Sequence, residues 1–250
     1  MATELLYLDD FDVLNASAKV TSVTVLDDGR LDIELDRTCF YPRGGGQDWD
    51  TGTIRSGDVT VEIDEVRLDE NGTVHHLGQP GGPTEGGPAV SEGADVVLEV
   101  DADRRSLNTR LHSAGHIVDL AVERLGLPWV PGKGAHYPHM SFVEYSGGAP
   151  EDVDDVRRRI EEEVASIIQA GSHNEVRFLP VAEMGAYCRH VPDNIPPNKP
   201  ARIVLYNEAF GVPCGGTHVR DVREVGALSI PKIKARKGVV KVSYAVEGIN

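Results

Sequence analysis

Hydrophobic and polar residues alternate through the first hundred positions with the period of two that is typical of half-buried β-strands. Residues 20–26 and 31–35 form two such runs, and the acidic and glycine residues between them predict a tight hairpin turn. A segment rich in glycine and proline, residues 78–93, is expected to be a long loop. The strands predicted for this half are residues 20–26, 31–35, 59–66, 73–76 and 96–100. Short strands separated by turn residues indicate a small β-barrel or sandwich.

The period changes at Asp103, where apolar residues begin to recur every three or four positions, as on one face of an α-helix. Asp101 or Asp103 can cap the start of this helix, and Gly126 with Pro128 is expected to end it. A second helix is predicted over about 151–169. The remaining predictions are a strand pair within 135–145, strands at 176–179, 202–206, 227–233 and 239–246, a helical turn at 182–187, and a loop at 192–200.

These two patterns divide the chain into an N-terminal β domain with a glycine-rich motif, residues 1–101, and a second domain, residues 102–250. Helices set among antiparallel strands give the second domain an α+β character. With 250 residues, 40% of them hydrophobic, the chain can bury two cores of modest size. The predicted fold is therefore α+β, with a small N-terminal β-barrel-like domain followed by an α+β domain.

Charge and cysteine content narrow the cellular setting. The 40 acidic and 25 basic residues give a formal net charge of −15, and arginine is used where lysine is scarce. Such a surface favours solubility and is typical of proteins from high-salt cells, although an ordinary acidic cytosolic protein fits equally well. Three widely spaced cysteines do not indicate a disulfide framework, and neither a signal peptide nor a long apolar run is apparent. We therefore expect a cytoplasmic protein.

A local cationic strip stands out against this acidic background. Four of the seven lysines lie in the last twenty residues. Such a strip is a candidate contact for a polyanion such as RNA. The alternative is an edge strand that carries lysines to protect a sheet from pairing with its neighbours. The residues proposed for the contact are Lys232, Lys234, Arg236 and Lys237.

The strongest candidate chemistry comes from two imidazole-bearing segments about a hundred positions apart. His112 and His116 are four residues apart on the predicted helix, so both rings can reach one ion. Cys214 and His218 bracket Gly-Gly-Thr, a turn flexible enough for both side chains to converge. Thiolate and imidazole are the ligands of tetrahedral Zn²⁺, so together the two segments predict one zinc ion. Rival ligands, ranked lower, are Cys188, His190, His136 and His139.

The motifs around these ligands resemble a known family. Asn-Thr-Arg-Leu-His-Ser-Ala-Gly-His at 108–116 and Cys-Gly-Gly-Thr-His-Val at 214–219 resemble the editing domain of alanyl-tRNA synthetase and its freestanding relatives, the AlaX proteins. The segment Phe-Tyr-Pro-Arg-Gly-Gly-Gly-Gln at 40–47 is similar to the glycine-rich segment of that family. With no synthetase catalytic core before it and Met1 close to the first strand, the chain is expected to be a freestanding editor of the medium-length type.

The resemblance implies a zinc-containing editing domain that hydrolyses the ester of mischarged seryl-tRNA(Ala), and of glycyl-tRNA(Ala) for the longer type. A synthetase pocket sized for alanine cannot strongly reject serine or glycine, so a second site must remove the errors. The tRNA acceptor end is the implied partner, and His112, His116, Cys214 and His218 are the implied zinc ligands. Further candidates are Gln47, Ser113 and Thr217 as substrate or catalytic residues, and Gly44, Gly45 and Gly46 as the glycine-rich loop.

Several alternatives stay open at this stage. Gln47 could instead be an exposed residue of a glycine hairpin, and Ser113 and Thr217 could support the ligands. The metal could activate water, or it could position and polarise the substrate while separately held water attacks; a complete ligand set favours the second. A threonyl-type editing domain for seryl-tRNA(Thr), or a zinc-stabilised RNA-binding module without catalysis, would use similar ligands. Oligomeric state does not follow from the sequence.

Overall fold

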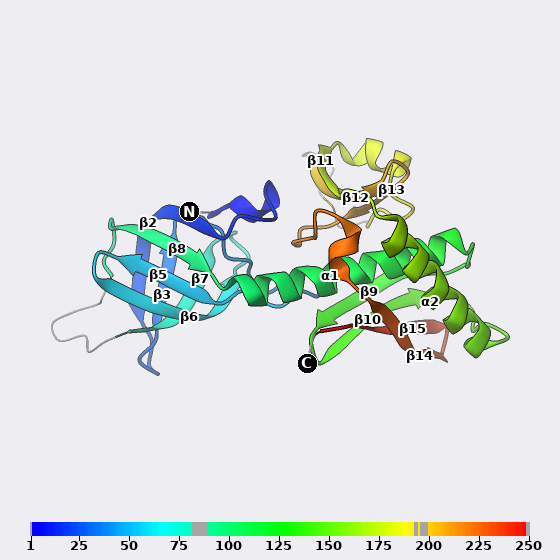
Figure 1. The fold of residues 1–250 in the computed structure, drawn as a ribbon. Helices are drawn as coiled ribbons and strands as arrows, with labels where there is room; N and C mark the ends of the chain where they lie inside the picture. Colours follow the sequence, from blue (N-terminus) through cyan, green and yellow to red (C-terminus); the bar gives the residue numbers. More distant parts are fainter. Residues whose placement is uncertain (1, 82–89, 193–194, 196–199, 249–250) are drawn as a thin grey trace. The chain divides into compact units, whose positions relative to one another are not determined.

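The computed structural model describes residues 2–81, 90–192, 195 and 200–248, and the chain divides into two compact units (Figure 1). Unit 1 comprises residues 1–44 and 48–106, and unit 2 comprises residues 45–47 and 107–250. Most of the two loops predicted around residues 78–93 and 192–200 lies outside the described residues. None of the helices in the described part of the chain is long and apolar enough to cross a bilayer.

Unit 1 is built on a closed six-stranded barrel whose neighbouring strands are all antiparallel. Around the barrel the order is β2-β3-β7-β6-β5-β8. The strands are β2 (Asn15–Val25), β3 (Leu31–Leu35), β5 (Gly52–Ser56), β6 (Val59–Leu68), β7 (Val74–Pro80) and β8 (Asp95–Val100). Alternate residues such as Ile33, Val61 and Leu98 are buried, as the period of two predicts. The expected barrel is therefore confirmed.

Smaller elements of unit 1 flank the barrel. Strands β1 (Glu4–Leu5) and β4 (Arg37–Thr38) pair in parallel, and a 3₁₀ helix, η1 (Leu6–Leu8), follows β1. Strand β7 continues to Pro80, beyond Gly78 where the sequence predicted a loop. Gly78 pairs with Leu31 on one side and with Ile63 on the other. Pairing on both sides overrides the low strand propensity of glycine.

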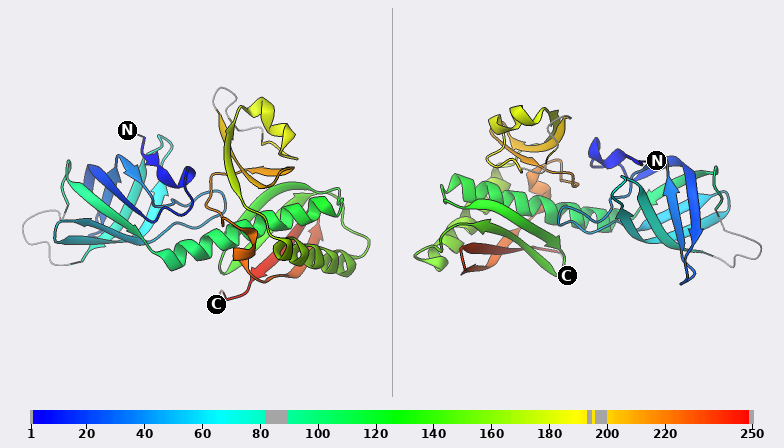
Figure 2. Two further views of the ribbon diagram at one scale, coloured as in Figure 1. Left: turned by 45° about the horizontal axis from the view of Figure 1, so that its top comes forward. Right: turned by 180° about the vertical axis from the view of Figure 1, so that it is seen from behind.

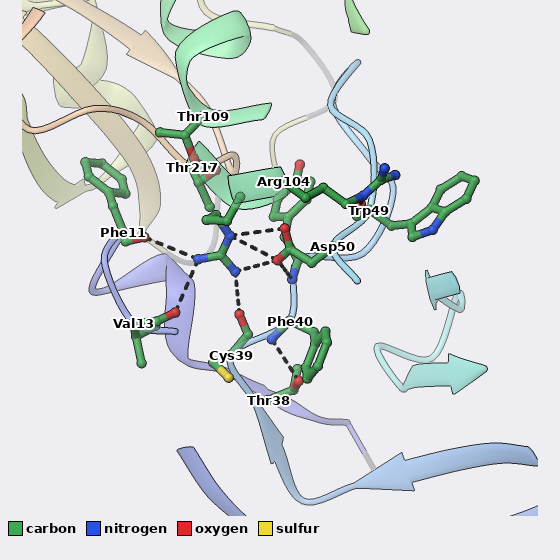
Figure 3. A network of polar contacts seen from close by, with 12 residues as sticks. Phe11, Val13, Thr38, Cys39, Phe40, Trp49, Asp50, Arg104, Thr109 and Thr217 are labelled. Atoms are coloured by element: carbon green, nitrogen blue, oxygen red, sulfur yellow. Dashed lines mark hydrogen bonds and ion pairs between the residues drawn. The ribbon is translucent and has the colours of Figure 1, made fainter. Parts of the chain in front are cut away.

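A buried arginine cross-links the segments of unit 1 (Figure 3). Arg105 is 3% exposed, and its guanidinium donates to both carboxylate oxygens of Asp50. It also donates to the backbone oxygens of Phe11, Val13 and Cys39. Nothing in the local sequence pattern indicated this network, because its members lie up to 94 positions apart. A buried charge that is paired and hydrogen-bonded in this way fixes the chain segments around it.

Helix α1 (Ala102–Arg124) confirms the predicted helix and its acidic cap. The Asp101 carboxylate accepts hydrogen bonds from the backbone N–H groups of Asp103 and Arg104, satisfying donors that the first helical turn leaves free. Helix α2 (Val153–Ala170) is capped in the same way by Asp152, whose side chain accepts from Asp155 N. Both helices therefore begin where the sequence places a short acidic side chain.

In unit 2, α1 and α2 lie on one face of an antiparallel sheet with the order β14-β15-β10-β9 (Figures 1 and 2). The strands are β9 (Val130–Tyr137), β10 (Met140–Ser146), β14 (Leu228–Arg236) and β15 (Val239–Val246). Tyrosines of the sheet reach α1: Tyr145 donates to the Asp119 carboxylate and Tyr244 donates to the Leu111 carbonyl oxygen. These bonds fix the face of α1 that carries the candidate ligands.

A second, smaller sheet lies across α1 from the first (Figure 1). Its order is β11-β12-β13, formed by β11 (Glu175–Leu179), β12 (Ala201–Asn207) and β13 (Phe210–Pro213). The 3₁₀ helices η2 (Val181–Ala186) and η3 (Val222–Val225) complete the unit. Strand β13 was not predicted, since its four residues include a glycine and a proline. The turn that follows β13, residues 214–218, contacts α1.

Candidate metal centre

Four side chains of unit 2 bring ligand atoms together within 4.8 Å of one another. His112 and His116 come from one face of α1, and Cys214 and His218 come from the turn that follows β13. The Cys214 Sγ atom lies 3.4 Å from His112 Nε2 and 3.3 Å from His218 Nε2. Ligand atoms of a tetrahedral zinc site are separated by about 3.3–3.6 Å, given Zn–N and Zn–S bonds of about 2.0–2.3 Å. The predicted ligands therefore converge.

One ring nitrogen shows that this group fits a cation. His116 Nε2 is buried and has no hydrogen-bond partner among the described residues. A buried polar atom left unpaired is costly and needs an explanation. A zinc ion held by the four ligands supplies the missing partner, and the soft and borderline donors Sγ and Nε2 are those that zinc prefers. The residues present therefore fit this metal.

Hydrogen bonds on the far side of the rings leave Nε2 free on two of the histidines. His112 Nδ1 lies 2.7 Å from Gln47 Oε1, and His116 Nδ1 lies 3.3 Å from Asp119 Oδ2. Amide and carboxylate oxygens only accept, so both Nδ1 atoms carry a proton, and Nε2 is the ring atom left to bind a metal. His218 Nδ1 has the Tyr206 hydroxyl at 2.9 Å. Such partners orient metal-binding histidines.

Burial and neighbouring charges shift the pKa values of the four candidate ligands. Burial lowers the pKa of His112 and of His218 well below the usual value, so both rings are neutral. Burial also acts to lower the pKa of His116, but the Asp119 carboxylate and the Cys214 sulfur raise it to about 9. Burial would raise the pKa of Cys214, yet the adjacent His116 imidazolium lowers it overall. The two shifts favour a thiolate on Cys214 beside a protonated His116, and metal binding at these residues would release that proton.

The cysteine turn can approach α1 closely because of a glycine. A Cβ atom at Gly216 would lie 2.2 Å from His112 Cε1, so no larger residue fits there. Arg202, on β12, is 8% exposed and donates to the carbonyl oxygens of Cys214 and Gly216. The backbone of the turn is thus held on one side by Arg202 while its side chains face the helix.

Gln47 is completely buried and lies behind the ligands. Its Oε1 accepts from His112 Nδ1 and from Thr217 N, and its Nε2 donates to Thr217 Oγ1 at 2.9 Å. Thr217 Oγ1 also lies 2.7 Å from Thr109 Oγ1, and Ser113 Oγ accepts from Val219 N. The exposed glutamine of the alternative interpretation is wrong. The side chains of Gln47, Ser113 and Thr217 are not among the residues that line the cavity, and their hydrogen bonds run to the ligands and to the turn that carries Cys214 and His218.

This geometry makes Gln47 a test of ligand orientation. Replacing Gln47 with leucine removes the acceptor for His112 Nδ1 and leaves the Thr217 N–H unpaired. Loss of such a supporting partner costs about 10–100-fold in metal affinity or activity. We expect that loss in a zinc-competition titration with a chelator. Gln169→Leu, on the exposed end of α2, is the matched control and should bind zinc as the wild type does. Equal zinc affinity in both variants would contradict the orienting role.

A cavity of about 640 Å³ opens beside the ligands, a size suited to a small organic group. His112, His116 and Cys214 form part of its wall, together with Gly45 and Gly46 of the glycine-rich segment. The remaining wall combines apolar, cationic and acidic residues, including Phe210, Val212, Pro213, Lys133, Arg189, Asp119 and Glu123. The site therefore offers a metal position at one wall and both apolar and positive surface nearby.

The other candidates of the sequence have distinct places. Cys188 is buried in an apolar cluster with Met184 and Leu205, as its core interpretation expected. His190 lines the cavity from an exposed position, and His139 is exposed. His136 is buried, with its ring stacked on His112. Residues that the sequence did not single out are Asp119, Tyr206, Arg202 and Tyr244, which support the ligands or their neighbours.

The cationic strip lies on the edge strand β14 and in the turn after it. Lys232, Lys234, Arg236 and Lys237 are all exposed. β14 pairs with β15 alone within the described sheet, so it occupies the position that edge protection requires. An RNA contact by the same side chains stays a prediction.

Comparison with known proteins supports the family resemblance. A family model described as "tRNA synthetases class II (A)" matches residues 11–104, which covers most of unit 1. The alanyl-tRNA editing protein AlaX-L of Pyrococcus horikoshii is 28% identical over 249 residues, which is 96% of this chain and 57% of that protein. The chain is a relative of the AlaX editing proteins and of the alanine–tRNA ligases. Its resemblance to them is therefore confirmed.

In two ligases, the region similar to this chain is a small part of a longer protein. The alanine–tRNA ligase of Methanopyrus kandleri is 30% identical over 253 residues, which is 97% of this chain and 26% of the ligase. The ligase of Nitrosopumilus maritimus is 31% identical over 255 residues, which is 99% of this chain and 26% of that ligase. This relative of the AlaX proteins thus spans about a quarter of each ligase and just over half of AlaX-L.

Proposed function

We propose that this chain is a zinc-dependent deacylase that hydrolyses the aminoacyl ester of mischarged seryl-tRNA(Ala), with glycyl-tRNA(Ala) as the second candidate substrate. The observation that carries the proposal is the convergence of His112, His116, Cys214 and His218, the first three of which line a cavity. Similarity to an alanyl-tRNA editing protein over nearly the whole chain supports the choice of substrate. The partner is the acceptor end of tRNA(Ala).

The residues divide the task among them. His112, His116, Cys214 and His218 hold the zinc ion, while Gln47 and Asp119 keep two of the imidazoles in the binding tautomer. Bound zinc would polarise the ester carbonyl and help to position the aminoacyl group. The apolar wall of Phe210, Val212 and Pro213 suits the terminal adenosine, and Lys133 with Arg189 suits its phosphate.

An editing site must hydrolyse mischarged tRNA(Ala) while sparing correctly charged alanyl-tRNA(Ala). A site that hydrogen-bonds the serine hydroxyl leaves buried polar groups unpaired when alanine enters, and it rejects alanine strongly for that reason. Glycine has no such group, so its removal requires a steric test against the alanine methyl group. Serine is therefore the substrate that we expect to be hydrolysed fastest.

Deacylation of purified seryl-, glycyl- and alanyl-tRNA(Ala), with and without a chelator, tests the proposal. We expect turnover of seryl-tRNA(Ala) that stops on chelation and returns with added zinc, while alanyl-tRNA(Ala) is spared. The absence of turnover with tRNA binding retained would favour a zinc-stabilised RNA-binding module. Faster turnover of seryl-tRNA(Thr) than of seryl-tRNA(Ala) would favour threonyl-type editing.

Neutralising the cationic strip tests its part in tRNA binding. In a variant with Lys232, Lys234, Arg236 and Lys237 changed to glutamine, we expect weaker tRNA binding and unchanged zinc content. Each cation that contacts a phosphate contributes about one unit to the slope of log affinity against log salt, so the slope should fall in proportion. Titrations across a range of salt concentrations measure it.

The matched control changes the same amount of charge elsewhere. Arg55, Arg67, Arg158 and Arg159 are 42–59% exposed at the side chain and each has an acidic neighbour. Their replacement by glutamine should leave the salt slope near that of the wild type. Equal affinity in the strip variant and the wild type would show that the strip serves only to protect the edge of β14.

A further inference from the structure

A third histidine of the cavity, His136 on β9, lies next to the ligands without being one of them. Its side chain is 4% exposed, and its ring is stacked on that of His112, with centroids 4.5 Å apart and planes inclined by 17°. It is not a member of the four-residue ligand group, and it lines the same cavity as His112, His116 and Cys214. His136 is therefore close enough to take part in chemistry at the site.

The hydrogen bonds of Tyr244 define which nitrogen of His136 carries the proton. Tyr244 donates its hydroxyl proton to the Leu111 carbonyl oxygen at 2.9 Å, and a carbonyl oxygen can only accept. The same hydroxyl is bonded to His136 Nδ1, so its oxygen must accept a proton from that nitrogen. Nδ1 is therefore protonated, and Nε2 keeps its lone pair.

Glycines make room for this ring in its fixed orientation. A Cβ atom at Gly115 would lie 2.5 Å from His136 Cε1, and one at Gly134 would lie 2.7 Å from His136 Nε2. Gly115 is in the interior of α1, where glycine is less favourable than alanine. The close approach of His136 explains that unfavourable choice. The hydrogen bond of this ring to the described residues is made by Nδ1, so the lone pair of Nε2 is available to a small group in the cavity.

We propose that His136 Nε2 accepts a hydrogen bond from the water that attacks the aminoacyl ester, and so orients that water beside the metal ligands. This inference rests on the proposed deacylase function. Four protein ligands are as many as a tetrahedral zinc ion would take, so the attacking water would need an acceptor of its own.

Two other acceptors of the cavity wall are poorly placed for that water. The two Asp119 oxygens already accept from His116 and Tyr145. Glu123 is seven residues beyond His116 on α1, about 10 Å along the helix axis at 1.5 Å per residue. His136 combines a free lone pair with direct contact to the ligand His112.

A matched pair of variants separates the two nitrogens of the ring. In His136→Asn, the amide N–H can still donate to Tyr244, but the side chain ends short of Nε2. In His136→Gln, the amide oxygen can take the place of Nε2. For seryl-tRNA(Ala), we expect kcat to fall about 100-fold in H136N, with KM unchanged, and to stay within about tenfold of wild type in H136Q.

Three further measurements show whether the loss comes from water alone. Zinc content should remain at one per chain in both variants. Affinity for 3′-serylamino-3′-deoxyadenosine, an amide that is not hydrolysed, should be unchanged, because water is not part of that equilibrium. Nitrogen-15 NMR of the zinc-loaded wild type should show His136 protonated at Nδ1 and bare at Nε2.

Several results would overturn the assignment. A wild-type kcat in H136N would exclude a part in the reaction, and a proportional loss of analogue affinity would make His136 a substrate contact. Loss of zinc would make its role structural, and a proton on Nε2 would remove the acceptor. If the wild-type protein turned over no aminoacyl-tRNA, the proposed function itself would fail; the NMR result would then still report on the tautomer.

Discussion

Replacing Cys214 with alanine is expected to abolish zinc binding and the proposed deacylase activity together. The Cys214 sulfur lies 3.3–3.4 Å from the Nε2 atoms of two histidines, and it is the one thiolate of the group. Without it, three imidazoles remain, two of them with pKa values lowered by burial. Zinc content should fall from about one per chain to a small fraction, and kcat/KM by at least about 100-fold, since the metal contributes several kcal/mol.

Metal analysis and the sulfur-to-cobalt charge-transfer band of the cobalt-substituted protein measure the first effect, and deacylation measures the second. Cys188→Ala is the matched control, because Cys188 is buried in an apolar cluster outside the ligand group. It should keep both zinc and activity. A Cys214→Ala protein that kept a full complement of zinc would show that the ligand set is wrong.

The second large effect is on stability. Replacing Asp50 with alanine leaves the Arg105 guanidinium buried without its carboxylate partner. Removing one member of a buried ion pair costs about 3–5 kcal/mol. For a unit of about 100 residues, each kcal/mol lowers the melting temperature by about 4–8 °C. We therefore expect the unfolding midpoint of unit 1 to fall by at least about 10 °C, measured by calorimetry.

Two companion variants make that result specific. Asp95 forms an exposed ion pair with Lys19 in the same unit, and Asp95→Ala should change stability by no more than about 0.5 kcal/mol. The double variant Asp50→Leu with Arg105→Met replaces the pair by apolar side chains and should recover part of the loss. If Asp50→Ala alone had the same melting temperature as the wild type, the ion pair would not contribute to the stability of unit 1.

Local features of the sequence were enough to predict most elements of the fold. The period of two gave five of the six barrel strands, and the helical period with Asp101 as cap gave α1. Strand β5 was missed because it is short and begins at a glycine, and one of its two partners, β8, lies far along the chain. Strand β13 was missed because its four residues include a glycine and a proline, although its partner β12 immediately precedes it.

For the metal site too, local sequence features predicted some properties and long-range contacts determined the others. The spacing of His112 and His116 on a helix, and of Cys214 and His218 around two glycines, are local facts that specify ligand type. The sequence suggested a substrate contact for Gln47, and the structure places it behind His112 with both ends of its amide occupied. Its partner Thr217 is 170 positions away. No short-range pattern reports such a pairing.

By itself, the sequence determined which residues carry metal chemistry, where helices and strands run, and the family that the chain resembles, because each of these depends on neighbours a few positions apart. Only the tertiary structure decided that the two ligand segments meet, that Gln47 orients His112, and that His136 presents a free nitrogen to the cavity. These features depend on contacts between residues 65 to 133 positions apart in the sequence.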